Sequence, residues 1–167
     1  MNRKTTPTTT HAGPSIQQMF DERMSPERVT SLLFIVWVAH LPPGLLADMA
    51  RLGPAREWLT TIACLLDVPV APVGRWLCTR SRPRARRLCR EDSAGVLALV
   101  RLIGRVQSIV CESGDPANFD AGRWTARFLT SPSPALSRLR PCEYLATSRG
   151  QELVSQLIEL QQTGAYA

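Results

Sequence analysis

Residues 93–111 constrain the fold more than any other part of the sequence. They have helical character, and apolar side chains surround almost the whole circumference of the expected helix. The apolar positions leave only a narrow polar stripe through Arg101, Arg105, Ser108 and Glu112. A helix with so little hydrophilic surface must be covered on most sides. Two coverings fit the sequence: a second copy of the chain, which would make it self-associate, or the N-terminal half of the same chain.

Residues 32–39, with the sequence LLFIVWVA, form the most apolar run in the chain. The run is much shorter than the roughly 20 residues needed to cross a bilayer, and a Pro-Pro-Gly sequence ends it shortly afterwards. It begins well into the chain, behind the charged residues Glu27 and Arg28, which argues against a signal peptide. We therefore predict a buried helix here.

Residues 1–25 are rich in threonine and contain proline, a composition typical of a mobile arm. An alternative role for this arm is contact with DNA through Arg3 and Lys4.

The net charge of +6 is concentrated in the first part of the chain. Residues 1–90 contain 13 basic and 6 acidic side chains, a balance of +7, whereas residues 91–167 contain 7 and 8, a balance of −1. This asymmetry suggests an acidic polymer as the partner of the first half and a protein surface as the partner of the second. Arginine supplies 19 of the 20 basic residues, which also fits a high-GC coding bias.

Residues 57–77 have the outline of a helix, a tight turn and a second helix. The first helical pattern is interrupted at residues 67–69, and the period then resumes. The apolar positions that carry the two patterns are Leu59, Ile62, Ala63 and Leu66, followed by Val73, Trp76 and Leu77. This is the arrangement of a helix-turn-helix. The second helix begins with Pro-Val-Ala-Pro, so few of its side chains can read base edges.

Arginines accumulate between positions 75 and 90 with no acidic residue among them. Guanidinium groups that meet phosphates give strong, salt-dependent and largely non-specific affinity for DNA. The predicted DNA-binding residues are Arg75, Arg80, Arg82, Arg84, Arg86 and Arg87, with Arg90 at the end of the cluster. The alternative is a solvated linker whose arginines pair with acids such as Glu91 and Asp92.

The pattern of residues 116–167 predicts short helices separated by helix-breaking residues. Trp124 and Phe128 share one face of a helix that ends at the Ser-Pro-Ser-Pro sequence of residues 131–134. Pro141 opens a short helical piece over residues 142–146.

The final predicted helix starts with Ser148-Arg149-Gly150-Gln151, which has the form of a capping box. Its apolar stripe consists of Leu153, Val154, Leu157 and Ile158, and Gly164 is placed to end it.

The order and spacing of these landmarks resemble the toxin-binding domain of the Xre/MbcA/ParS antitoxin family. The resemblance covers residues 88–167, and residues 57–77 loosely match the helix-turn-helix half of the same family. The matching positions are Phe119, Asp120, Ala121, Trp124, Leu129, Pro132, Pro134, Ala135, Leu136, Arg140, Pro141, Tyr144, Leu145, Ala146, Thr147, Gly150, Gln151, Val154, Leu157 and the closing Gly164-Ala165-Tyr166-Ala167. One departure is Ser137-Arg138, where the family tends to have glycine.

The resemblance implies an all-α protein in three parts: a flexible arm (1–25), an Xre-like helix-turn-helix bundle (26–87) and a small helical toxin-binding domain (88–167). It implies a homodimer that neutralises a RES-domain toxin, an enzyme class that destroys NAD, and that represses its own operon by binding operator DNA. The toxin-binding residues it implies are Trp124, Arg140, Tyr144, Thr147, Gln151, Gly164, Ala165, Tyr166 and Ala167. The last four are expected to enter the NAD site, where the ring of Tyr166 could stack and the terminal carboxylate could meet an arginine.

Metal binding, cofactor binding and catalysis are not expected. The cysteines are five in number, without a C-x-x-C pair, and only two histidines are present, so ligands at zinc-site spacing are lacking. We expect reduced, mostly buried thiols in the cytoplasm. The sequence has no G-x-S-x-G and no glycine-rich phosphate loop, and the carboxylates Glu143 and Glu152 are read as solvated charges.

The function predicted from the sequence is therefore that of a type II antitoxin. The first alternative is a dimeric helix-turn-helix transcriptional regulator without a toxin partner. A third possibility, a helical adaptor for another protein, would show no salt-sensitive DNA binding.

Overall fold

The computed structural model describes residues 26–82, 85–113 and 119–162, without the side chains of residues 26–32 and 162. Within these ranges the regular structure is helical, apart from one isolated bridge between Ala55 and Arg87. The α-helices are α1 (Pro26–Ala39), α2 (Pro43–Leu52), α3 (Glu57–Leu66), α4 (Val70–Trp76), α5 (Arg90–Ser113), α6 (Ala121–Thr130) and α7 (Ser148–Gln162), with the short 3-10 helices η2 (Pro134–Leu136) and η3 (Pro141–Tyr144) between the last two. The predicted all-α class is confirmed.

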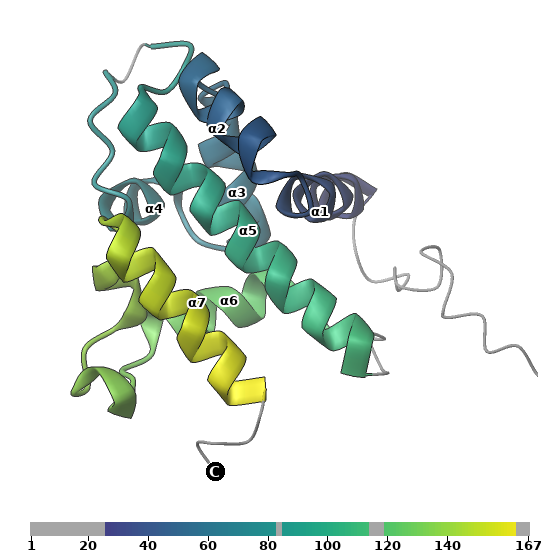
Figure 1. The fold of residues 1–167 in the computed structure, drawn as a ribbon, viewed down its shortest axis with the longest axis vertical. Helices are drawn as coiled ribbons and strands as arrows, with labels where there is room; N and C mark the ends of the chain where they lie inside the picture. Colours follow the sequence, from purple (N-terminus) through teal and green to yellow (C-terminus); the bar gives the residue numbers. More distant parts are fainter. Residues whose placement is uncertain (1–25, 83–84, 114–118, 163–167) are drawn as a thin grey trace, which may run out of the picture.

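Helix α5 is the centre of the molecule (Figure 1). α1 and α2 lie along one side of it, and α6 and α7 lie along the other. α1 approaches so closely that a Cβ atom at Gly104 would collide with the side chain of Ala39. By length and composition α5 could also cross a membrane, but its apolarity is accounted for by the helices that cover it.

This packing decides between the two coverings predicted for residues 93–111. The N-terminal half of the same chain covers α5, mainly through α1. The reason for expecting self-association through this helix is thereby removed. The buried residues of both halves form one hydrophobic cluster, and the boundary between residues 87 and 88 stays a prediction.

The prediction of a buried helix at residues 32–39 is only half right. Ile35 and Val38 of α1 are buried against α5. Leu33, Phe34 and Trp37, on the other side of α1, are exposed. The apolar run therefore supplies one core-facing side and one exposed side, on which Phe34 contacts the ring of Trp58 in α3.

Helices α3 and α4 have the predicted helix, turn and helix arrangement. Their axes turn by 103° at the three-residue break between them. Asp67 adopts the left-handed conformation there, with φ of 58°, and its backbone N–H donates to the carbonyls at the end of α3. Glycine is the usual residue in that conformation, and aspartate is among the side chains that tolerate it.

The turn before η3 explains the departure from the family pattern at residues 137–138. Ser137 and Arg138 both have positive φ, at 53° and 66°. This is the region of backbone conformation in which glycine carries no steric penalty. A preference for glycine in related chains is therefore expected on physical grounds.

The start of α7 differs by one residue from the predicted capping box. The hydroxyl oxygen of Thr147, not that of Ser148, accepts a hydrogen bond from a backbone N–H, that of Gly150, at 3.1 Å. The Gln151 side-chain amide donates to the carbonyl of Leu145 at 2.8 Å instead of closing the box. The preceding η3 turn sets this register, which sequence spacing alone does not show.

Candidate interaction surfaces

The predicted toxin-binding residues fall into two groups at opposite ends of α7. The first group is Arg140, Tyr144, Thr147 and Gln151 at the junction between η3 and α7. A Cβ atom at Gly150 would overlap the carbonyl oxygen of Tyr144, so the two elements touch through their backbones. Thr147 and Gln151 spend their side chains on local hydrogen bonds, whereas Arg140 is exposed. Thr147 and Gln151 therefore shape the junction, whereas the exposed side chain of Arg140 is available to contact a partner.

Trp124 lies at the other end of α7. Its indole stacks on the ring of Phe128, with centroids 5.4 Å apart and planes within 5°. It also lines an apolar hollow of about 160 Å³ that Ile158 and Gln161 of α7 border. Gly164, Ala165, Tyr166 and Ala167 follow directly on this end of α7 but lie outside the described residues.

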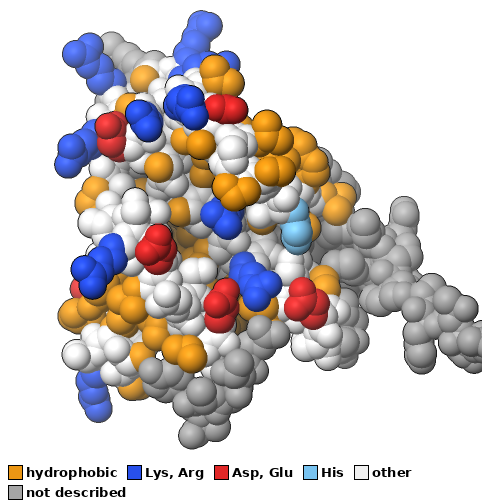
Figure 2. All heavy atoms as spheres, viewed as in Figure 1, with side chains coloured by type: hydrophobic (Ala, Val, Ile, Leu, Met, Phe, Trp, Pro, Cys, Tyr) orange, Lys and Arg blue, Asp and Glu red, His pale blue; other side chains and the backbone are white. Residues whose placement is uncertain are grey.

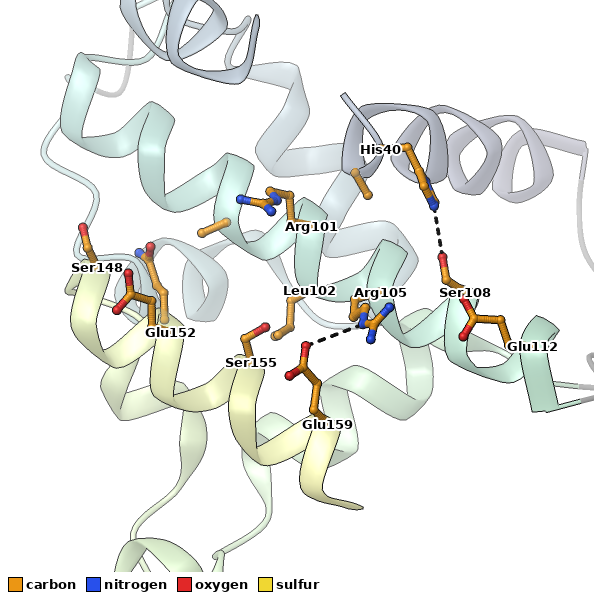
Figure 3. A pocket seen from close by; sticks show the side chains of 13 residues that line it. His40, Arg101, Leu102, Arg105, Ser108, Glu112, Ser148, Glu152, Ser155 and Glu159 are labelled. Atoms are coloured by element: carbon orange, nitrogen blue, oxygen red, sulfur yellow. Dashed lines mark hydrogen bonds and ion pairs between the residues drawn. The ribbon is translucent and has the colours of Figure 1, made fainter. Parts of the chain in front are cut away.

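A polar groove between α5 and α7 was not predicted as a site (Figure 3). Its volume is about 590 Å³. Arg101, Arg105, Ser108 and Glu112, the polar stripe of the sequence, line its α5 side, and Glu152, Ser155 and Glu159 line its α7 side. Arg105 and Glu159 face each other across it at 3.7 Å, and His40 approaches Ser108 at 3.4 Å. The sequence shows the polar stripe of α5, but the groove forms only because α7 packs beside that stripe.

The arginine-rich segment is attached to the fold at several points. Arg87 donates to the carbonyl of Gly53 at 2.7 Å, and Arg56 donates to the carbonyl of Arg82 at 3.0 Å. The carboxylate of Asp92 accepts from the backbone N–H groups of Arg80 and Ser81 at 2.9 Å and 2.7 Å. The alternative prediction for this segment is a solvated linker whose arginine side chains pair with acids such as Asp92. The carboxylate of Asp92 instead accepts hydrogen bonds from the backbone N–H groups of Arg80 and Ser81.

Asp92 is buried, and its environment favours the ionised form. Burial alone would raise the pKa of this carboxyl group. The hydrogen bonds donated by Ser81, Arg80 and Cys89 outweigh burial and hold its pKa below the usual value. The ionised carboxylate of Asp92 thus holds the backbone at Arg80 and Ser81.

Of the predicted DNA-binding residues, Arg75, Arg80, Arg82 and Arg86 are exposed, while Arg84 lies outside the described residues. Arg87 is exposed as a residue, but its guanidinium group already bonds the carbonyl groups of Leu52 and Gly53. Figure 2 shows Arg side chains gathered at the end of the molecule where α5 begins. Val70 and Ala71, at the start of α4, are exposed but carry no hydrogen-bonding group on their side chains.

The expectation of mostly buried thiols is wrong. The structure has no disulfide among the five cysteines, all of which it describes; only Cys142 is buried, and Cys64 and Cys78 are exposed. Burial raises the pKa of the Cys142 thiol. Cys64 belongs to the outer side of α3, where helical spacing turns it away from the core. Among the described residues there is no group of three or more His, Cys, Asp or Glu that could hold a metal ion.

Comparison with known proteins shows a partial similarity to an antitoxin. The "Prs ADP-ribosylating antitoxin" of Sphingobium sp. (strain YBL2) is 41% identical to this chain over 80 residues. The match covers 48% of this chain and 50% of the relative. The similarity therefore spans about half the length of the relative. No protein-family model and no solved structure matches the chain.

Proposed function

We propose that this chain is an antitoxin whose partner is a toxin that uses NAD. The observation that carries the proposal is the 41% identity over 80 residues to a protein named as an antitoxin. ADP-ribosylation in general takes its ADP-ribose from NAD, so the words of that name fit a partner with an NAD-binding cleft. The resemblance to the Xre/MbcA/ParS family narrows the partner to a RES-domain toxin. The chain would act in the cytoplasm, as an inhibitor and not as an enzyme.

Residues 163–167 are the part proposed to block the toxin's NAD site. The support is the fixed position of α7, from which these residues continue. Val154 and Ile158 are buried in the core, and the Thr147 cap together with the contact of Gly150 on η3 holds the other end. A short segment that starts from a rigid helix loses less conformational entropy on binding than one that starts from a mobile chain.

Co-expression with the toxin encoded beside this chain tests the proposal. The full chain is expected to restore growth and cellular NAD, and a variant lacking Gly164–Ala167 is expected to lose this protection while keeping its helical circular dichroism spectrum. A Glu57→Ala variant serves as a control, because Glu57 is exposed and belongs to α3, in the other half of the chain from the predicted toxin-binding residues. Full protection by the shortened variant would refute the blocking role, whereas failure of the full chain to protect would refute the antitoxin proposal itself.

We further propose that the N-terminal half binds the operator of its own operon. The support is the α3–α4 arrangement beside four exposed arginines, Arg75, Arg80, Arg82 and Arg86. Because α4 offers few hydrogen-bonding side chains, phosphates would supply most of the contacts. The alternative function, a helix-turn-helix regulator without a toxin partner, rests on the same observation. It predicts DNA binding together with no effect on any neighbouring toxin.

The salt dependence of DNA binding tests this second role. Replacing Arg80, Arg82 and Arg86 by alanine is expected to lower the slope of log K against log salt by up to about 3, because each lost phosphate contact contributes about 0.9. A matched control replaces the exposed Arg127, Arg138 and Arg149, which removes the same charge from the other half. An equal change of slope in both variants would show that only net charge matters.

A further inference from the structure

The outer side of α4 is apolar. Val70 is 40% exposed, Ala71 beside it is exposed, and Gly74, one turn further along the helix, is half-buried. Residues four apart lie on the same side of a helix, so Val70 and Gly74 form one surface with Ala71 next to it. We call these three residues the apolar face of α4. Their side chains carry no hydrogen-bond donor or acceptor.

This apolar face lines a hollow of about 530 Å³. The other residues that line the hollow are Arg56, Leu59, Arg75, Cys78 and Thr79. Among the described residues of this lining there is no Asp or Glu. The hollow therefore combines an apolar wall with positive charge.

Val70 also lines a second hollow, of about 280 Å³, together with the exposed Arg86 and with Glu57. Because Val70 borders both hollows, the apolar face lies between Arg75 on one side and Arg86 on the other. The edges of base pairs in a groove of DNA are likewise flanked by phosphates on both sides. This arrangement favours DNA over an acidic protein segment as the occupant.

Operator binding as proposed above, on which this inference rests, brings α4 to the major groove, because the second helix of a helix-turn-helix contacts base edges there. Phosphate contacts carry no sequence information of their own. The apolar face cannot read the hydrogen-bonding pattern of the bases either. One sequence-dependent feature of the major groove is itself apolar, the C5 methyl group of thymine.

We infer that the apolar face of α4 recognises thymine through its methyl group, while Arg75 and Arg86 hold the phosphates on either side. Burial of thymine methyl groups against Val70 and Ala71 removes apolar surface of both partners from water. Gly74 has no side chain and so lets the DNA approach the helix closely. The operator is accordingly expected to carry thymines where it faces α4.

Binding of the full chain to the promoter fragment of its own operon tests this inference. The fragment is amplified with either dTTP or dUTP, since uracil pairs with adenine as thymine does but lacks the methyl group. Fluorescence anisotropy at one salt concentration is expected to show weaker binding to the uracil form, by roughly fourfold for each methyl group that the protein buries.

The double variant Val70→Ser with Ala71→Ser is expected to bind both forms almost equally. Its salt dependence should stay that of the wild type, because the arginines are unchanged. A matched control replaces Ala135 and Leu139 by serine. Both are exposed apolar residues of the other half of the chain, so this variant should keep the preference for thymine. Circular dichroism checks that the variants stay folded.

Two results would overturn the inference and leave operator binding in place. The first is equal affinity of the wild type for the two forms. The second is a preference for thymine that persists in the double variant, because the methyl groups would then act through other residues or through the shape of the DNA. Absence of binding to either form would refute operator binding and this inference together, and would favour an acidic protein segment as the occupant. The antitoxin proposal is unaffected by all three results.

Discussion

Asp92 shows how one buried carboxylate can organise a surface segment. It accepts hydrogen bonds from the N–H groups of Arg80 and Ser81, and the Ser81 hydroxyl in turn accepts from the N–H of Cys89. These bonds hold the chain between α4 and α5 against the helix that Asp92 belongs to. The exposed side chain of Arg80 therefore extends from an anchored backbone.

Replacing Asp92 by asparagine is expected to destabilise the fold by about 1–3 kcal/mol at neutral pH, because buried backbone donors lose a charged acceptor. The folded-state pKa of Asp92 is lowered, so its contribution is present above the unfolded-state value of about 3.9 and is lost as the pH falls through the folded-state pKa. Urea unfolding at a series of pH values checks this. A deficit of the variant that is the same at all pH values would contradict the assignment.

Thr147 and Ser148 test the register at the start of α7. Thr147→Ala is expected to cost about 1 kcal/mol of stability, because it removes the hydroxyl that accepts from Gly150. Ser148→Ala should cost almost nothing, since Ser148 is exposed and is the first residue of the helix itself. Thermal unfolding of the two variants decides between them. A larger loss of stability for Ser148→Ala than for Thr147→Ala would support the capping box predicted from the sequence instead.

At the scale of elements, the sequence was informative where local patterns decide the structure. The Ser-Pro-Ser-Pro sequence ends α6, the break at Asp67 separates α3 from α4, and the apolar circumference of residues 93–111 becomes the central helix. Contacts between distant parts of the chain could not be predicted. The polar groove needs α7 beside α5, and the anchoring of the arginine-rich segment needs Arg56 and Asp92.

The contact of α7 with η3 can be tested through a glycine. Gly150→Ala is expected to destabilise the protein by about 1–3 kcal/mol, because its Cβ atom would overlap the carbonyl oxygen of Tyr144. Since α7 carries residues 163–167, protection against the toxin should fall as well. Gly44→Ala is the matched control in α2, where a Cβ atom meets nothing within 4 Å. Chemical unfolding that shows equal effects for the two variants would contradict the close approach at η3.

At the scale of the whole molecule, α5 connects the two proposed functions. It packs against α1 and α2 on one side and against α6 and α7 on the other, so both halves share one core. The basic surface proposed for DNA lies where α5 begins, and the helix proposed to position the blocking segment lies along its side (Figure 1). Sequence patterns indicated the two functions separately, and the packing shows that buried residues of both halves belong to one hydrophobic cluster.

The central claim is that this chain occupies the NAD site of its toxin partner. The most direct measurement is the inhibition of the purified toxin's NAD consumption by this chain at a series of NAD concentrations. We expect inhibition to weaken as the NAD concentration is raised, and the variant lacking Gly164–Ala167 not to inhibit. Inhibition that is independent of the NAD concentration and unchanged in the shortened variant would contradict this claim.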